Sequence, residues 1–357
     1  PAWMGFPSIH LAVPQTSHSG NYNVPVHVQT SAPTRIDLAG GTLDIWPLYL
    51  FHSRAQTINV AIGLRATCSI RPSQDGRIHI TSKDTGTTLT ADHWQELDTH
   101  GAHRLLAHIA RFFQVENISI TTEAASPLGA GIAGSSALNI AVCAGLAHWT
   151  NANYPPDKLF TLAMNLEAQT LRIPTGVQDY RPAVYGGISA IELNALGIRH
   201  VPLNVNVADF ERRIVLAYSG DSRSSGINNW DITKRHIDGS DIIAKHFDQI
   251  ANIAAATRDA LTRHDWAELA AQIKLEWQER QALDPKVTTP AIDRLITQAE
   301  AAGALAGKVC GAGGGGCVFF LIDPNRRTDV CQAIIKSGSQ LLESPIDIDG
   351  LILKSTA

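Results

Sequence analysis

The stretch PLGAGIAGSSAL, residues 127–138, places glycine, alanine and serine residues directly before an apolar run that is predicted to be a helix. A backbone approaches a phosphate closely only where side chains are small, and glycine also permits positive φ angles. The first turn of a helix adds unpaired N–H donors and a partial positive charge, so the pattern predicts an anion site. The predicted phosphate-contacting residues are Pro127, Gly129, Ala130, Gly131, Ala133, Gly134, Ser135, Ser136 and Ala137.

Other kinds of glycine loop fit this stretch less well. No GK[ST] follows it, which excludes the P-loop pattern. GAGIAG can be read as the G-x-G-x-x-G of a dinucleotide site, but residues 144–153 contain no acidic residue where such a site needs one. From the loop alone, a tight strand-to-helix turn without a ligand remains open.

Length and composition describe a globular protein with room for two cores. The chain has 357 residues, of which 44% are hydrophobic and 17% are charged. The formal net charge of −4 gives no electrostatic footprint for nucleic acid or for an anionic membrane. It does not exclude a phosphate site, because such sites use local backbone N–H groups.

Cysteines and the N-terminus indicate a reducing compartment. The five cysteines are odd in number and form no CxxC, and the fourteen histidines form no HxxxH or HxH cluster, so neither a disulfide framework nor a zinc site is expected. Residues 1–25 lack a basic start before an apolar run and are interpreted as a leader or an edge strand. Residues 128–149 carry no charge but hold four glycines and several polar residues, which favours a loop and a buried helix over a membrane span. We expect a cytoplasmic protein.

Hydrophobic periodicity predicts a mixed α+β chain with a boundary near residues 204–209. Residues 26–205 would form an N-terminal domain, and residues 206–357 a C-terminal domain. Strands are predicted within 26–100 and at 117–124, 185–193, 214–218 and 346–354. Helices are predicted at 103–113, from the loop to about 149, and at 157–171, 242–263, 266–282, 290–302 and 328–343. Residues 219–226 are predicted to be a polar loop, and residues 308–322 a strand that brackets a second glycine loop.

Three motifs in order resemble those of the GHMP kinases, a family that includes galactokinase, homoserine kinase and mevalonate kinase. SAPTRIDLAGGTLDIWP (31–47) resembles motif 1, the loop at 127–138 resembles motif 2, and KVCGAGGGGCVFFL (308–321) resembles motif 3. In motif 2, Ala133 replaces a usual glycine and Gly134 a usual hydroxyl residue. The resemblance implies an N-terminal ribosomal-protein-S5-domain-2-like fold, a C-terminal ferredoxin-like fold and an ATP-dependent small-molecule kinase.

The sugar and heptose-phosphate kinases are the members that this chain resembles in detail. AGG follows the arginine of motif 1, SGDSRSSG (219–226) resembles a segment of these kinases, and residues 275–316 resemble their long run into motif 3. This implies transfer of the γ-phosphate of ATP to the anomeric hydroxyl of a sugar or sugar phosphate, such as a heptose 7-phosphate. A family member acting on a mevalonate-like or inositol-like substrate, and a non-catalytic sensor of ATP and sugar, remain alternatives. A homodimer is left open.

The resemblance also implies roles at named positions. Asp179 would orient or deprotonate the acceptor hydroxyl, and Arg35 would lie beside it near the transferred phosphate. Ser135 and Glu167 would bind Mg²⁺, with Ser136 as the other candidate serine. Asp44 would bind sugar hydroxyls. Gly41 and Thr42 stand where galactokinases carry Glu-His, which argues against galactose.

Two further segments are assigned to the substrate. Arg223 and Ser222 would bind a phosphate carried by the sugar, because a guanidinium suits bidentate phosphate recognition. Gly313 and Gly314 of the second glycine loop would lie at the substrate, with the loop backbone pressed against the first loop. Lys308 is interpreted as a surface residue without a role.

Overall fold

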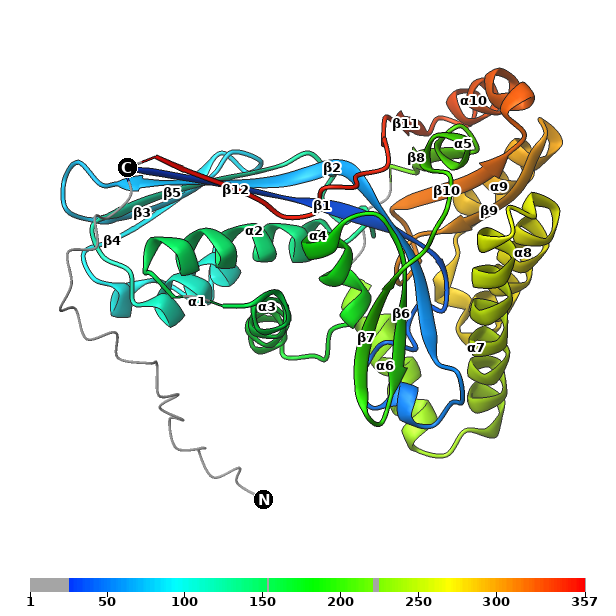
Figure 1. Cartoon of the computed structure of the whole chain (residues 1–357), viewed down its shortest axis with the longest axis horizontal. Coiled ribbons are helices and arrows are strands. Elements are labelled where there is room, and N and C mark those ends of the chain that lie inside the picture. Colours follow the sequence, from blue (N-terminus) through cyan, green and yellow to red (C-terminus); the bar gives the residue numbers. More distant parts are fainter. Residues whose placement is uncertain (1–25, 153, 221–224, 357) are drawn as a thin grey trace.

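The computed structural model describes residues 26–356 apart from 153 and 221–224. Its elements confirm a mixed α+β fold built on two sheets (Figure 1). Among the described residues no helix is both long and apolar enough to cross a membrane. The predicted leader at 1–25, and Ser222 and Arg223, lie outside the described residues.

The larger sheet has eight strands in the order β12-β1-β2-β5-β3-β4, with β6 paired to β2 and β7 to β6. Its long members, β1 and β2, run antiparallel and are rich in β-branched residues that suit a pleated surface. The strands are β1 (His27–Ala39), β2 (Gln56–Pro72), β3 (Ile78–Ser82), β4 (Thr87–Ala91), β5 (Ile118–Ala124), β6 (Ile188–Asn194), β7 (Gly197–Pro202) and β12 (Ile352–Thr356).

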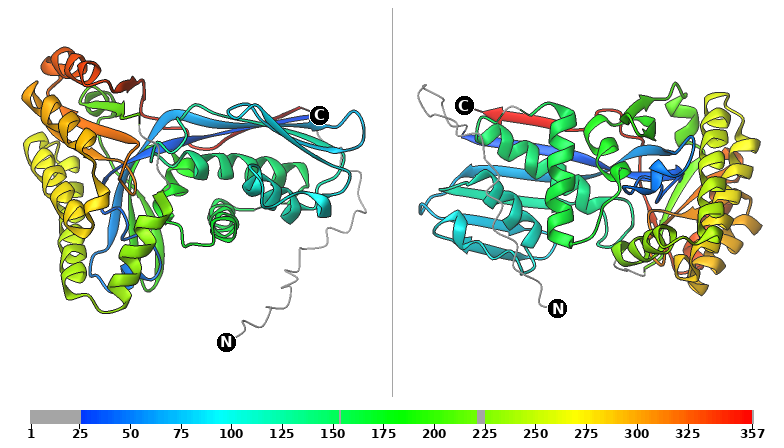
Figure 2. Two further views of the ribbon diagram at one scale, coloured as in Figure 1. Left: turned by 180° about the vertical axis from the view of Figure 1, so that it is seen from behind. Right: turned by 90° about the horizontal axis from the view of Figure 1, so that it is seen from below.

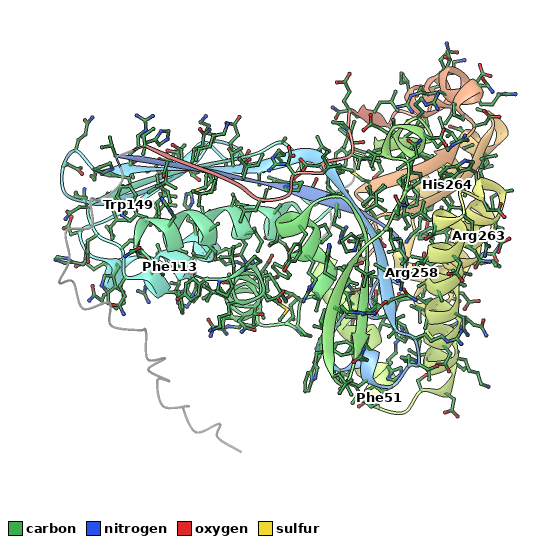
Figure 3. All side chains as sticks on the ribbon, viewed as in Figure 1. Phe51, Phe113, Trp149, Arg258, Arg263 and His264 are labelled. Carbon is green, nitrogen blue, oxygen red and sulfur yellow. The ribbon has the colours of Figure 1, made fainter. Side chains whose placement is uncertain are left out.

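Helices cover one face of this sheet (Figure 2). The central one follows the glycine loop and is apolar on nearly all sides, as a helix between a sheet and other helices should be. Phe113 and Trp149, labelled in Figure 3, mark the ends of two of these helices under the same end of the sheet. The helices are α1 (Arg104–Phe113), α2 (Gly134–Trp149), α3 (Pro156–Leu171) and α4 (Arg181–Tyr185).

The smaller sheet has four strands in the order β11-β8-β10-β9 and carries the long helices of the C-terminal half (Figure 1). Its strands are β8 (Ile214–Tyr218), β9 (Ala304–Val309), β10 (Cys317–Ile322) and β11 (Gln340–Leu342). The helices are α5 (Val207–Glu211), α6 (Ser225–Ile237), α7 (Asp241–Thr262), α8 (Trp266–Leu283), α9 (Pro290–Ala301) and α10 (Arg327–Lys336). Single 3-10 turns occupy Leu48–Leu50, Trp94–Glu96, Val177–Asp179, Pro285–Val287 and Pro324–Arg326.

Four sequence expectations differ from these elements. The predicted loop at 219–226 gives way to α6 at Ser225, and the predicted helix 328–343 ends at Lys336, because Gly338 and the strand β11 follow. The predicted strand 346–354 contributes β12 only from Ile352 onward. The division at 205/206 assigns β12 to the C-terminal half, whereas its hydrogen bonds run to β1 in the larger sheet.

The two halves are joined by polar contacts as well as by packing. Arg258 on α7, labelled in Figure 3, donates through Nη1 to Glu192 Oε1 on β6 at 2.8 Å. Deeper in, Lys308 on β9 places Nζ 3.0 Å from Asp37 Oδ2 on β1 and 3.0 Å from Glu276 Oε2 on α8. All three side chains are almost fully buried. The interpretation of Lys308 as a surface residue is therefore wrong.

Charge compensation decides the protonation of this buried cluster. Burial opposes the charge of Lys308, but Asp37 and Glu276 outweigh burial and raise its pKa. Burial likewise opposes the charge of Asp37, yet Lys308 and Arg35 lower its pKa below the usual value. Burial raises the pKa of Glu276. Removing one charge from such a cluster leaves another uncompensated in the interior.

Replacing Lys308 with methionine should therefore lower the free energy of unfolding by about 3–5 kcal/mol, because Asp37 loses its nearest cation. Adding Glu276→Gln should recover part of that loss, since it removes the second uncompensated carboxylate. Exposed Lys336 provides the control, and Lys336→Met should change stability by no more than about 0.5 kcal/mol. Urea unfolding measures all of these variants. Equal effects of Lys308→Met and Lys336→Met would contradict the proposed burial.

Candidate active site

The glycine loop lies between β5 and α2, as expected. Gly129, Gly131 and Ala133 have φ angles of 68°, 73° and 62°, so the chain turns through left-handed conformations before the helix begins at Gly134. A Cβ on Gly131 would come within 2.7 Å of Cys310 O, so only glycine fits there. The N–H groups of the first turn of α2 therefore lie next to a backbone segment that carries no large side chains.

The second glycine loop packs directly on the first. Cys317 N donates to Ala130 O at 2.7 Å, and Cβ atoms added to Gly311 and Gly316 would lie 2.6 Å from Gly131 O and Ala130 O. The contact confirms that the backbone of the C-terminal half presses against the phosphate loop. Because backbone meets backbone, the relative position of the two loops is fixed within narrow limits.

Arg35 and Asp179 form an ion pair beside the loop. Arg35 extends from β1 and donates to Asp179 Oδ1 through Nε at 3.1 Å and through Nη2. Its Nη1 donates to Gly131 O at 3.0 Å, which ties the pair to the phosphate loop. Burial opposes the charge of Arg35, but the carboxylates of Asp179 and Asp37 outweigh it and raise its pKa. Asp179 keeps 28% of its side chain exposed, so it faces the cavity.

Glu167 presents a buried carboxylate from α3 to the first turn of α2. Ser135 Oγ donates to Oε1 at 2.7 Å, while Ser136 Oγ and Tyr180 Oη donate to Oε2 at 3.0 and 2.7 Å. Burial raises the pKa of Glu167, and these hydroxyl donors, all neutral, only partly oppose that effect. A carboxylate and hydroxyls beside an anion site are hard oxygen donors of the kind that Mg²⁺ takes, so these residues fit the ion.

Asp44 lies close enough to Asp179 for the two carboxylates to interact. It is buried, and its Oδ2 accepts from the backbone N–H of Gln178 at 2.8 Å. A Cβ on Gly176 would come within 2.2 Å of the same oxygen, so the turn before Asp179 is packed on Asp44. Burial, reinforced by the charge of Asp179, raises the pKa of Asp44 to about 7.

A cavity of about 420 Å³ brings these groups together. Arg35, Thr42, Asp44, Glu167 and Asp179 line it. So do most residues predicted to contact phosphate, namely Pro127, Gly129, Ala130, Gly131, Ala133, Gly134, Ser135 and Ser136. The glycine-rich loop, with the Glu167 carboxylate against it, lines one part of the cavity, and Thr42, Asp44 and Asp179 line the part that we call the acceptor end.

Some predicted residues lie away from the cavity lining. Ala137 is buried within α2, and Gly41 packs against Asp37 and Arg280. Gly313 and Gly314 contact Val287: a Cβ on Gly313 would lie 2.4 Å from Val287 O, to which Gly314 N donates at 2.6 Å. Gly311 and Ala312 line the cavity in their place.

Several site residues had not been identified from the sequence. Asn229 on α6 lines the cavity, Tyr180 holds Glu167, and Arg280 on α8 reaches Gly311 O at 2.8 Å. Glu276 and Arg280 are spaced four residues apart on one helix face, a spacing that suggests a shared partner. However, a glutamate and an arginine at this spacing are equally typical of an exposed ion pair, so the sequence alone does not show that they are buried.

Two family models match the chain. The model of the GHMP kinases N terminal domain matches residues 100–187, and that of the GHMP kinases C terminal matches residues 257–340. The first range contains the phosphate loop with Glu167 and Asp179, and the second contains Arg280 and the second glycine loop. The two models thus include cavity residues from both halves, whereas Arg35, Thr42, Asp44 and Asn229 lie outside the matched ranges.

Individual relatives agree with this assignment. D-glycero-alpha-D-manno-heptose 7-phosphate kinase of Campylobacter jejuni is 27% identical over 319 residues, covering 87% of this chain and 93% of the relative. Mevalonate kinase of Thermococcus sibiricus is 23% identical over 345 residues, covering 91% of this chain and 98% of the relative.

Solved structures share the fold. That of a D-glycero-D-manno-heptose 1-phosphate kinase from Bacteroides thetaiotaomicron has a TM-score of 0.75 at 23% identity, covering 92% of this chain and 99% of that one. At this identity the likeness concerns the fold alone. With both halves matched in order, the chain belongs to the GHMP kinase family of small-molecule kinases.

Proposed function

We propose that this kinase transfers the γ-phosphate of ATP to the anomeric hydroxyl of a sugar or sugar phosphate that resembles a heptose 7-phosphate. The observation that carries the proposal is the Arg35–Asp179 pair, which joins the glycine-rich loop to the acceptor end of one cavity. A group that orients a hydroxyl must lie within hydrogen-bond reach of it, and Asp179 faces the space where such a hydroxyl would enter. The heptose 7-phosphate kinase among the relatives supports the sugar-phosphate class.

Phosphoryl transfer depends on positioning and on stabilised charge more than on covalent help. Arg35 is held by Asp179 and Gly131 O, so its guanidinium is pre-oriented between acceptor and phosphate loop. Asp179 would accept the hydrogen bond of the acceptor hydroxyl and take up its proton as the phosphate is transferred. The N–H groups at the start of α2 would hold phosphate oxygens.

Mg²⁺ would be held by Glu167 and Ser135. Of the two serines that donate to Glu167, Ser135 is exposed and Ser136 is buried, which favours Ser135 as the metal ligand. When bound, the ion would neutralise charge on the nucleotide phosphates. Tyr180 would keep the Glu167 carboxylate oriented, because its hydroxyl donates to Oε2 at 2.7 Å.

The acceptor end of the cavity would receive the sugar. Asp44 and Thr42 line it, and Asp44 would bind a sugar hydroxyl. The proposed phosphate subsite at Ser222 and Arg223 comes from the sequence resemblance. Asn229 on α6 also lines the cavity.

Asp179→Asn should reduce turnover by about 10²–10⁴-fold while leaving Mg·ATP affinity within a few-fold, because the variant keeps the shape but not the basic carboxylate. Release of ADP with a panel of sugars and sugar phosphates measures turnover, and calorimetry measures affinity. Asp241→Asn, at the exposed first turn of α7, is the matched control and should keep full turnover.

An active Asp179→Asn variant would contradict the role of Asp179. Nucleotide binding without turnover in the wild type on every acceptor of the panel would favour the sensor over the kinase proposal.

Asp44→Asn should change how stability depends on pH. Since the pKa of Asp44 is raised to about 7 in the folded chain, the folded state binds more protons than the unfolded state between about pH 4 and 7. The Asp44 contribution therefore decreases as pH rises through that window, by up to about 4 kcal/mol. The free energy of unfolding of Asp44→Asn minus that of wild type should therefore be larger at pH 8 than at pH 5, when both proteins are measured by urea unfolding. A difference that does not depend on pH would show that Asp44 titrates normally.

A further inference from the structure

We propose that Arg280 is a positioning residue that holds three segments around the acceptor end of the cavity as one unit. These segments are the turn at Thr42, the second glycine loop at Gly311 and the start of α6 at Asn229. Arg280 does not line the cavity, whereas these three residues do. It would thus act on the reaction only through them, and its effect on catalysis rests on the proposed function.

The contacts form a continuous chain. Arg280 is 3% exposed and donates through Nη2 to Gly311 O at 2.8 Å and through Nη1 to Thr42 Oγ. The Thr42 hydroxyl uses its own proton to donate to Asn229 Oδ1 at 3.2 Å. Each donor and acceptor has a defined role, because the guanidinium can only donate and the hydroxyl does both. Displacing one member therefore leaves a buried neighbour without its partner.

Both backbone polar groups of Gly311 are hydrogen-bonded. Its N–H donates to Asp37 Oδ1 at 2.8 Å, and its carbonyl accepts from Arg280. A Cβ on Gly311 would lie 2.6 Å from Gly131 O, so this peptide also touches the phosphate loop. Arg280 therefore contributes to the distance between the two glycine loops.

Thr42 has a backbone conformation that requires support. Its φ angle is 76°, and the backbone of a β-branched residue is strained in that region. Its neighbour Gly41 could not carry a side chain, since a Cβ would lie 2.9 Å from Asp37 Oδ2 and 3.2 Å from Arg280 Nη1. The strained turn is thus packed around the guanidinium, which places the Thr42 hydroxyl at the cavity wall.

A lysine could not replace this arginine. A guanidinium presents donors in a fixed planar fork, whereas an ammonium is a point charge on a flexible stem. Arg280→Lys keeps the positive charge that offsets Asp37 and Glu276, so the fold should persist. The lysine should nevertheless lose its contact with either Gly311 O or Thr42 Oγ. The acceptor end of the cavity would then no longer be held to the phosphate loop.

Hydrogen exchange of the full-length chain tests the linkage without any substrate. Arg280→Lys and Thr42→Val should each raise exchange in both Gly311–Cys317 and Ser225–Ile237, because each removes one link of the same chain. Arg294→Lys, at an exposed position on α9, should change neither segment. Were Thr42→Val to affect only Ser225–Ile237, and Arg280→Lys only Gly311–Cys317, the proposed linkage would be overturned.

Kinetics then separate positioning from a merely structural role. Once an acceptor is found, Arg280→Lys should raise its KM about tenfold and weaken Mg·AMP-PNP binding about threefold, and adding Thr42→Val should cause little further loss. A lower Tm with an unchanged acceptor KM and unchanged nucleotide affinity would show that Arg280 only supports the fold. If no acceptor is found, the proposed function fails, while the exchange experiment still decides the linkage.

Discussion

The structure depends on the burial of Asp37 between the two halves of the chain. One oxygen of this carboxylate accepts from the Gly311 N–H and the other from Lys308, while Arg35 lies 3.8 Å away. A buried carboxylate without such partners would cost several kcal/mol, so the C-terminal half must deliver both Lys308 and Gly311 to this point. That requirement sets how the second glycine loop meets the first, and with it the geometry of the whole cavity.

The proposed catalytic groups, Arg35 and Asp179, are arranged around the same constraint. Arg35 lies two residues before Asp37 on β1, so the strand that carries the buried carboxylate also carries the cation paired with Asp179. Because Gly131 O accepts from Arg35, the phosphate loop and the acceptor end share one rigid connection. Such fixed dipoles and charges stabilise developing charge without reorganising during the reaction.

The sequence predicted what depends on local pattern. Glycine spacing located both loops, and periodicity located the helix before the loop and the long helices of the C-terminal half. It could not show burial of individual charges: Lys308 has the composition of a surface residue, and Arg280 lies on a helix with many exposed polar neighbours. The pairing of β12 with β1 joins residues more than 300 positions apart, which no local signal reports. Gly313 and Gly314 could not be told from Gly311 and Ala312, because a glycine run does not reveal which peptide faces the cavity.

Phosphorus NMR of the wild-type reaction tests the central claim most directly. The protein is incubated with Mg·ATP and D-glycero-D-manno-heptose 7-phosphate, the acceptor named in the proposed function. The account predicts ADP and a new sugar phosphate resonance coupled to the anomeric proton, with the 7-phosphate signal retained. A product phosphorylated at another hydroxyl would contradict it. So would unchanged ATP with the heptose phosphate while a parallel reaction phosphorylates a non-sugar acceptor.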